Sequence, residues 1–242
     1  MKTTGIIFAP IVYGRNAPGT LPAVLYDSSR NTLDGSFEGG LAAGDWALIN
    51  STIYALLLNG TTDYLSIPDN SLLSFGRTIA SSDHPFSVAA WINMTDATEF
   101  PIIKKGVYNT SGEWRFLVDA SDMLSFQLFD ESVADCYIGR KTADISGDEE
   151  AGIHVGASYS GSGTSAGVNL YINGVDVDNA DAELNAVSYV AMENGVAAIE
   201  IGKDDTLFAN GYISPQIQII NEEKNAAWFA AFYESTRNLY GV

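Results

Sequence analysis

Acidic side chains are the commonest groups in this sequence that could do chemistry, and two carboxylates facing one cleft could hydrolyse a glycosidic bond. Acids at alternating positions of a strand would place their carboxylates on one face. The nearest pattern runs from Asp176 to Glu183, but Ala180 breaks the alternation. We interpret this run as a solvated loop and predict no catalytic residue in it.

Calcium binding is a second chemistry open to acidic residues, because calcium takes several carboxylate, amide and carbonyl oxygens. Asp27, Asn31 and Asp34 lie in one segment at short spacings. The alternative is a connector whose Asp and Asn side chains form turns with their own backbone. We therefore predict calcium as the one cofactor, held by these three residues.

Nucleophilic and zinc-dependent chemistry is disfavoured by the few suitable residues. His84 precedes Pro85, which favours an extended or turn conformation, and His154 falls in a strand-like run. Neither histidine stands at a metal-ligand spacing from Cys136. We expect the protein not to be an enzyme, and a single cysteine excludes an intrachain disulfide.

Aromatic side chains with nearby amides or acids could instead recognise sugars, because a ring offers an apolar face beside polar groups. Tyr108, Trp114 and Tyr137 are the candidate ligand-binding residues. The alternative for each ring is packing in the core or against a sheet.

Composition limits the partners. The formal net charge of −18 repels phosphates and anionic lipids, so neither nucleic acid nor membrane insertion is expected. No stretch has the length of a membrane-spanning helix. The apolar run Ile6 to Ala9 is too short for a signal peptide, and we predict a first strand there and no export signal.

Strand-like runs separated by turns make up most of the chain. Phe86 to Ile92 is apolar at both parities, which predicts a central strand buried on both faces. Asn173-Gly174 between apolar residues predicts a two-residue hairpin turn. Asn221 could cap one late helix that continues through Tyr233, and Gly241 ends the pattern. We predict an all-β, antiparallel two-sheet sandwich with one short C-terminal helix, as a single domain over 1–242.

Six ordered segments resemble the laminin-G-like, concanavalin A-like jelly-roll family. Segment 86–92 reads FSVAAWI, as the family pattern does, and segment 58–68 is similar to F-x-G-x-x-D-Y-L-x-I-P. The run 154–177 resembles a strand, loop and strand ending in L-Y-I-N-G-V. The other matching segments are 26–35, 103–106 and 201–213.

The resemblance implies a concanavalin A-like jelly roll, a fold used more often in glycan-binding or adhesive modules than in enzymes. It also places Asp27, Asn31 and Asp34 in a loop that often contributes to a calcium site. Standalone copies with an acidic surface look like modules encoded by bacteriophages.

The function we predict is therefore a non-enzymatic glycan-binding or adhesive module of a bacteriophage virion, in its tail, fibre or head decoration. Its partners would be glycans or other virion proteins. The late segment 226–240 would pack on the sandwich or form a homo-oligomer contact. The first alternative is a purely structural decoration or assembly protein, and a less favoured one is a polysaccharide-degrading enzyme.

Overall fold

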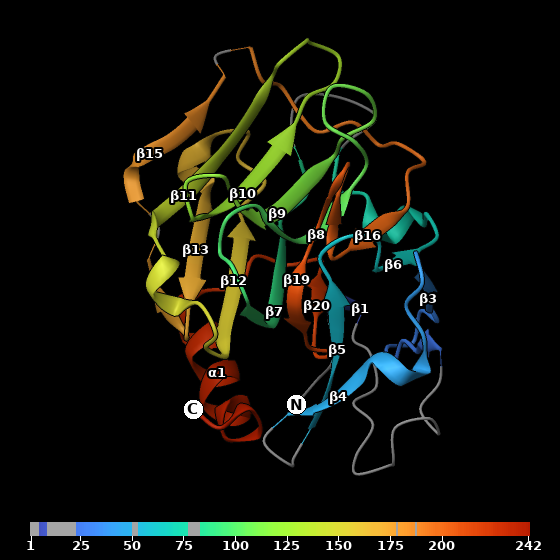
Figure 1. Cartoon of the computed structure of the whole chain (residues 1–242). Helices are drawn as coiled ribbons and strands as arrows, with labels where there is room; N and C mark the ends of the chain where they lie inside the picture. Colours follow the sequence, from blue (N-terminus) through green and yellow to red (C-terminus); the bar gives the residue numbers. More distant parts are fainter. Residues whose placement is uncertain (1–4, 9–22, 50–52, 77–82, 178, 187) are drawn as a thin grey trace.

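The computed structural model of the chain describes residues 5–8, 23–49, 53–76, 83–177, 179–186 and 188–242. Two large antiparallel sheets pack against each other, and one α-helix follows them (Figure 1). The predicted all-β sandwich with a C-terminal helix is confirmed. In the described part of the chain, no helix is long and apolar enough to cross a bilayer.

Sheet 1 carries the helix. Its strands are β1 (Ile6–Phe8), β4 (Trp46–Ile49), β5 (Ile53–Asn59), β7 (Phe86–Met94), β12 (Ile153–Tyr159), β13 (Val168–Ile172), β14 (Val175–Asp176), β19 (Asn210–Ile213) and β20 (Gln218–Ile220). They follow the order β14-β13-β12-β7-β19-β5-β4, with β20 pairing β7 and β1 pairing β20. The predicted first strand is thus present as β1, while Ala9 lies outside the described residues.

Sheet 2 forms the other layer. Its strands are β2 (Val24–Leu25), β3 (Gly35–Glu38), β6 (Tyr64–Ile67), β8 (Phe100–Lys105), β9 (Trp114–Val118), β10 (Met123–Phe129), β11 (Tyr137–Asp144), β15 (Asn179–Asn185) and β16 (Ile199–Ile201). Their order is β15-β11-β10-β9-β8-β16-β6-β3-β2. A separate ribbon pairs β17 (Lys203–Asp204) with β18 (Leu207–Phe208). The 3-10 turns are η1 (Ala43–Asp45), η2 (Ser71–Leu73), η3 (Ser146–Asp148) and η4 (Ser165–Gly167).

Strand β15 corrects one sequence interpretation. The acidic run from Asp176 to Glu183 is predicted as a loop, but its part from Asn179 onward belongs to β15, which pairs with β11 at the edge of sheet 2. There the Glu183 carboxylate accepts a charge-assisted bond from Arg140 at 2.9 Å. Backbone pairing with β11 therefore makes this segment a strand, although its polar side chains are typical of a loop.

The core lies between the two sheets and is rich in aromatic rings. Phe86 of β7 stacks on Phe75 with ring centroids 4.0 Å apart and meets Trp114 and Phe126 of sheet 2 at 5.4 and 5.5 Å. Strand β7 is buried along almost its whole length, as predicted. Alternate residues of β7 face the core, and Ala89 and Trp91 between them pack against the helix.

The hairpin between β13 and β14 has the predicted turn. Asn173 and Gly174 both have positive φ, 50° and 78°, as a primed turn requires. The Asn173 Oδ1 also accepts the His154 backbone N–H at 3.0 Å, which fixes the turn against β12. A Cβ on Gly174 would lie 2.8 Å from the Cα of Ala230, so only glycine lets the helix approach this closely.

Helix α1 (Ala226–Tyr240) starts four residues later than the sequence pattern predicts (Figure 1, red). Its N-cap is Asn225, whose side chain accepts the Trp228 N–H at 3.0 Å, and not Asn221. The Asn221 N–H instead bonds the Gly5 carbonyl at 2.8 Å, which extends the sheet edge. The helix ends as predicted at Gly241, with φ 79°.

Candidate functional site

Two of the three sequence-predicted aromatic residues meet at one end of sheet 2. Tyr108 lies in the loop between β8 and β9, and Tyr137 opens β11. Their rings stand edge to face at 89°, with centroids 5.7 Å apart, and both contact the Phe129 ring. Tyr108 and Tyr137 are half-buried, so each keeps part of its ring surface open to solvent.

A polar clip joins the two loops that carry these tyrosines. Asp135 Oδ1 accepts bonds from the Asn109 amide at 2.6 Å and the Tyr108 hydroxyl at 3.1 Å. The Asp135 N–H returns a bond to Asn109 Oδ1 at 3.2 Å. Both residues have positive φ, which Asn and Asp tolerate better than most side chains. The bonds from Asn109 and then Tyr108 lower the pKa of Asp135, so its carboxylate stays ionised.

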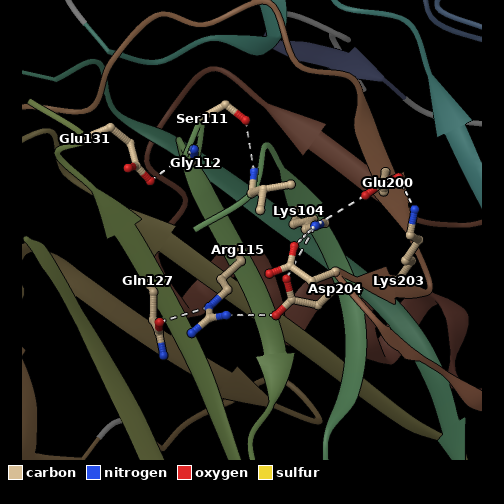
Figure 2. A network of polar contacts seen from close by, with 11 residues as sticks. Lys104, Ser111, Gly112, Arg115, Gln127, Glu131, Glu200, Lys203 and Asp204 are labelled. Carbon is tan, nitrogen blue, oxygen red and sulfur yellow. Dashed lines mark hydrogen bonds and ion pairs between the residues drawn. The ribbon is translucent and has the colours of Figure 1, made fainter. Parts of the chain in front are cut away.

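The loop of Tyr108 has a defined shape. Position 106 requires glycine for two reasons: its φ is 80°, and a Cβ there would overlap the Ser111 carbonyl group. The Gly112 N–H donates to Glu131 Oε1 at 3.1 Å, and Ser111 Oγ accepts the Val107 N–H at 3.3 Å (Figure 2). Burial raises the pKa of Glu131. The tyrosine pair therefore rests on two loops that are held both internally and to each other.

Arg115 connects the tyrosine pair to the outer face of sheet 2. Its guanidinium lies 5.4 Å from the ring centroids of both Tyr108 and Phe129, a cation–π geometry. The same group donates to Gln127 Oε1 at 3.0 Å and Asp204 Oδ2 at 2.8 Å (Figure 2). Arg115 is thus held in place by three kinds of partner and does not need a ligand to order it.

Lys104 continues this polar band on the next strand. Its ammonium lies 3.3 Å from Glu200, 3.5 Å from Asp204 and 2.8 Å from Asp205 (Figure 2 shows the first two). The β17–β18 ribbon supplies Asp204 and covers β8, which explains why Lys104 is only 2% exposed. Asp204 also pairs with Arg115, and Glu200 with Lys203, so three carboxylates balance three cations at this face.

Trp114, the third predicted ligand-binding residue, is wrongly assigned. Its side chain is completely buried between the sheets and contacts Phe75, Phe86 and Phe126. A ring without exposed surface cannot stack on a sugar. Trp114 shares a parity with the buried Phe116 of the same strand, and that alternation was the signal for a core position.

Two buried carboxylates have structural partners. Asp83 accepts the hydroxyls of Tyr159 at 2.8 Å and Tyr189 at 2.6 Å, and Glu113 pairs with Lys105 and accepts the Gly195 N–H at 2.9 Å. Burial raises the pKa of both acids. Their contacts fasten the long β15–β16 connection to the sandwich, which is a structural role.

The predicted calcium loop is closed by its own hydrogen bonds. Asp27 Oδ1 accepts the Ser29 N–H at 2.8 Å, and Asp27 Oδ2 accepts the Ser29 hydroxyl at 2.5 Å and the Leu33 N–H at 3.0 Å. Asp34 Oδ1 accepts the Asp27 N–H at 2.8 Å. Asn31 turns its amide nitrogen toward the Ile7 carbonyl at 2.7 Å. These contacts fit the turn-rich connector better than a preformed set of calcium ligands.

Calcium binding by Asp27, Asn31 and Asp34 stays a prediction, and the loop contacts set its test. Asp27→Ala should cost about 1–3 kcal/mol of unfolding free energy with or without calcium, because it leaves the buried Leu33 N–H without an acceptor. Thermal unfolding in calcium and in chelator measures this. A calcium-dependent rise in melting temperature for the wild type, absent from Asp27→Ala, would show instead that the loop holds the metal.

Comparison with known proteins supports the fold. The model of the concanavalin A-like lectin/glucanases superfamily (Laminin_G_3) matches residues 59–226. No curated protein matches the chain. Among solved structures, the binding domain of Paraclostridial Mosquitocidal Protein 1 aligns with a TM-score of 0.66 at 13% identity, covering 97% of this chain and 53% of that one.

Binding domains of botulinum neurotoxins resemble this chain in fold about as much as the mosquitocidal protein does. The receptor binding domain of the C/D mosaic serotype gives a TM-score of 0.66 at 18% identity, over 96% of this chain and 51% of that one. A structure of botulinum neurotoxin type C, a toxin whose cell entry depends on interaction with two ganglioside molecules, aligns with a TM-score of 0.62 at 17% identity. The alignment covers 94% of this chain and 51% of that one. The chain thus spans about half the length of these structures. By the family match over 59–226, the chain belongs to the concanavalin A-like lectin/glucanases superfamily.

Proposed function

We propose that this protein is a non-enzymatic glycan-binding or adhesive module, and that sugars contact it at the Tyr108–Tyr137 pair. The observation that carries the proposal is the meeting of two partly exposed tyrosines with the ionised Asp135 carboxylate and the Asn109 amide. Aromatic faces pack against the C–H surface of a sugar ring, while carboxylate and amide groups bond its hydroxyls.

Three further features support this assignment. The loops are anchored before any ligand arrives, so little conformational entropy would be lost on binding. Two apolar side chains, Val107 and Val133, are 37% and 38% exposed in the same two loops and enlarge the contact surface. The binding domains of similar fold include toxin receptor-binding domains, one of them from a neurotoxin that uses gangliosides.

The first test is a glycan array with wild-type protein and single alanine variants. Tyr108→Ala and Tyr137→Ala should each weaken binding to the positive glycans about tenfold, the equivalent of about 1.4 kcal/mol, because each removes one ring face. Tyr26→Ala, which removes a tyrosine that is 41% exposed elsewhere, is the matched control and should bind as the wild type does.

The outcomes separate the two leading functions. Repeated absence of wild-type binding, with and without calcium, would contradict the glycan proposal and favour a structural decoration or assembly role. Binding that survives both tyrosine substitutions would place the glycan elsewhere on the molecule.

A virion location is part of the proposal and rests on the resemblance of the sequence to bacteriophage modules. The acidic surface, with 30 Asp and Glu against 12 Lys and Arg, suits a particle protein that must stay soluble. Tail or capsid genes beside the coding gene would support this location, and a neighbourhood without particle genes would argue against it.

A further inference from the structure

A cleft of about 350 Å³ opens on the outer face of sheet 1, on the opposite layer of the sandwich from Tyr108 and Tyr137. Helix α1 covers one part of this face, where Trp91, Tyr240 and Ile53 form a buried apolar cluster. The helix ends at Tyr240, and the sheet beyond it is not covered by another helix in the described part of the chain. The cleft lies where the helix ends, between its last residues and the uncovered part of the sheet.

Strand alternation explains which side chains line the cleft. Trp91 and Asn93 lie two residues apart on β7, and Tyr212 and Ser214 lie two apart at β19, so all four point to the outer face. Tyr212 is the direct cross-strand partner of Asn93. A ring and an amide are thereby placed side by side in the cleft wall.

The floor of the cleft is rigid. The Trp91 ring stacks on Tyr240 with centroids 4.2 Å apart and planes 13° apart, and its Nε1 donates to Thr236 Oγ1 at 3.0 Å. The Tyr240 hydroxyl donates to Gln216 Oε1 at 3.0 Å and also contacts Ser214. The buried Trp91–Tyr240 pair therefore gives the cleft a fixed base, and the half-buried Tyr212 is a lining ring that keeps surface open to a ligand.

Polar groups without protein partners face this surface. The side chains of Asn93, Tyr212 and Glu150 make no hydrogen bond or ion pair with any residue in the described ranges. Asn93 and Tyr212 are half-buried, and Glu150 is exposed at the rim with its N–H bonded to the Met94 carbonyl at 2.8 Å. The amide of Asn93 and the hydroxyl of Tyr212 can each donate and accept a hydrogen bond, and the carboxylate of Glu150 can accept.

Charge restricts what the cleft could take. Glu150 lines it, whereas no Lys, Arg or His is among the described lining residues. The whole chain carries a net charge of −18. An anionic ligand would therefore be repelled, and a neutral or amine-bearing ligand would not.

We infer that this cleft is a second ligand site, for a pyranose unit that carries no negative charge. The sugar ring would pack on the half-buried Tyr212, above the buried Trp91–Tyr240 pair that supports the cleft, and its hydroxyls would bond Asn93, the Tyr212 hydroxyl and Glu150. The volume lies at the lower end of the range for small-ligand pockets, about 300–1,000 Å³, and fits a short saccharide. This inference goes beyond the proposed function, because it concerns the other sheet and different residues.

Three methyl glycosides test it by saturation-transfer NMR: glucoside, glucosaminide and glucuronide, each titrated onto the whole chain. We expect saturation transfer to the neutral and amino sugars, and at least about tenfold weaker binding of the glucuronide. Asn93→Ala and Tyr212→Ala should each weaken glucoside binding about tenfold. Glu150→Gln should narrow the difference between glucoside and glucuronide, because it removes the one acidic side chain at the rim.

Controls keep this result apart from the first site. Tyr137→Ala should leave cleft binding unchanged, whereas it should weaken binding to the array glycans about tenfold if the proposed function holds. Circular dichroism and melting temperature show whether each variant is folded, and Asn93→Asp offers a shape-conserving replacement if Asn93→Ala is not. No saturation transfer from the glucoside at 50 mM, transfer unaltered by Asn93 and Tyr212 substitution, or a preference for the glucuronide would each overturn the inference.

Discussion

Replacing Trp114 with alanine should lower the free energy of unfolding by about 3–5 kcal/mol, the cost of removing a large buried ring from a packed core. Trp114 has no exposed surface and lies 5.4 Å from the Phe86 ring centroid, at the centre of the aromatic cluster. Relaxation cannot fill the space, because two of the neighbouring rings, Phe86 and Phe126, are held on strands of different sheets. Urea unfolding of the two proteins measures the difference.

Tyr137→Ala is the informative comparison for this variant. Tyr137 is half-buried at the end of sheet 2, so its loss should cost less than half as much stability while weakening glycan binding. Trp114→Phe keeps most of the volume and removes an indole N–H that has no partner, so it should cost much less than the alanine variant. A stable Trp114→Ala protein that had lost glycan binding would contradict the burial of this ring.

Replacing His154 with leucine should remove a large part of the sensitivity of this protein to acid. The imidazole of His154, on β12, is completely buried between sheet 1 and α1, with its ring centroid 5.4 Å from that of Trp91 and 5.1 Å from that of Phe232. Neither ring nitrogen has a hydrogen-bond partner among the residues that the structure describes. Burial therefore disfavours the charged form and lowers the pKa of His154 from 6.5 to about 3.

The sign of the effect follows from proton binding. Below pH 6.5 the unfolded chain takes up a proton on His154 that the folded protein does not, so stability is present above pH 6.5 and is lost as the pH falls toward 3. Each pH unit in this window costs about 1.4 kcal/mol, which gives about 3 kcal/mol between pH 7 and pH 4.5. The exclusion of a charge from the helix–sheet interface is the physical cause.

Urea unfolding at pH 7 and at pH 4.5 tests this expectation. His154→Leu conserves volume and removes two unpartnered nitrogens, so at pH 7 its stability should stay within about 1.5 kcal/mol of the wild type. At pH 4.5 the variant should be the more stable protein. The exposed His84 provides the control, and His84→Leu should keep the wild-type pH dependence. An equal acid loss in His154→Leu and the wild type would refute the assignment.

The two ligand sites would give the protein two contacts on opposite layers. One lies on loops at the end of sheet 2, and the other lies beside the end of α1 on sheet 1. A module that held two sugars of one surface at once would gain avidity without any new contact between protein and sugar. Separate loss of the two activities in Tyr137→Ala and Tyr212→Ala would show that the sites act independently.

The local features of the fold could be predicted because each is written in neighbouring residues. Asn173-Gly174 specified a turn with positive φ at both positions, and the apolar run 86–92 specified a strand buried on both faces. The helix was predicted at the right place with the wrong cap. Asn221 and Asn225 are both good cap residues, and only the pairing of Asn221 with Gly5 at the sheet edge decides between them.

The candidate site could be predicted only in part, since its members come from loops and strand ends that are far apart in the sequence. Their residue type makes Tyr108 and Tyr137 candidates, but nothing in the sequence indicates that the two rings touch. Asn109 and Asp135, 26 residues apart, were not predicted at all, and neither was the place of Arg115. The pairing of β9, β10 and β11 brings these loops to one end of the sheet.

By itself, the sequence determined the alternation of faces, the turns, the late helix and the family resemblance, because these depend on residues close together in the chain. The tertiary structure alone decided which alternating face is covered. Trp114 lies between the sheets, Lys104 lies beneath the β17–β18 ribbon, and Trp91 lies beneath α1, although each sits on an ordinary strand. Burial depends on what packs from elsewhere in the chain, and that long-range packing also makes the tyrosine pair and the cleft.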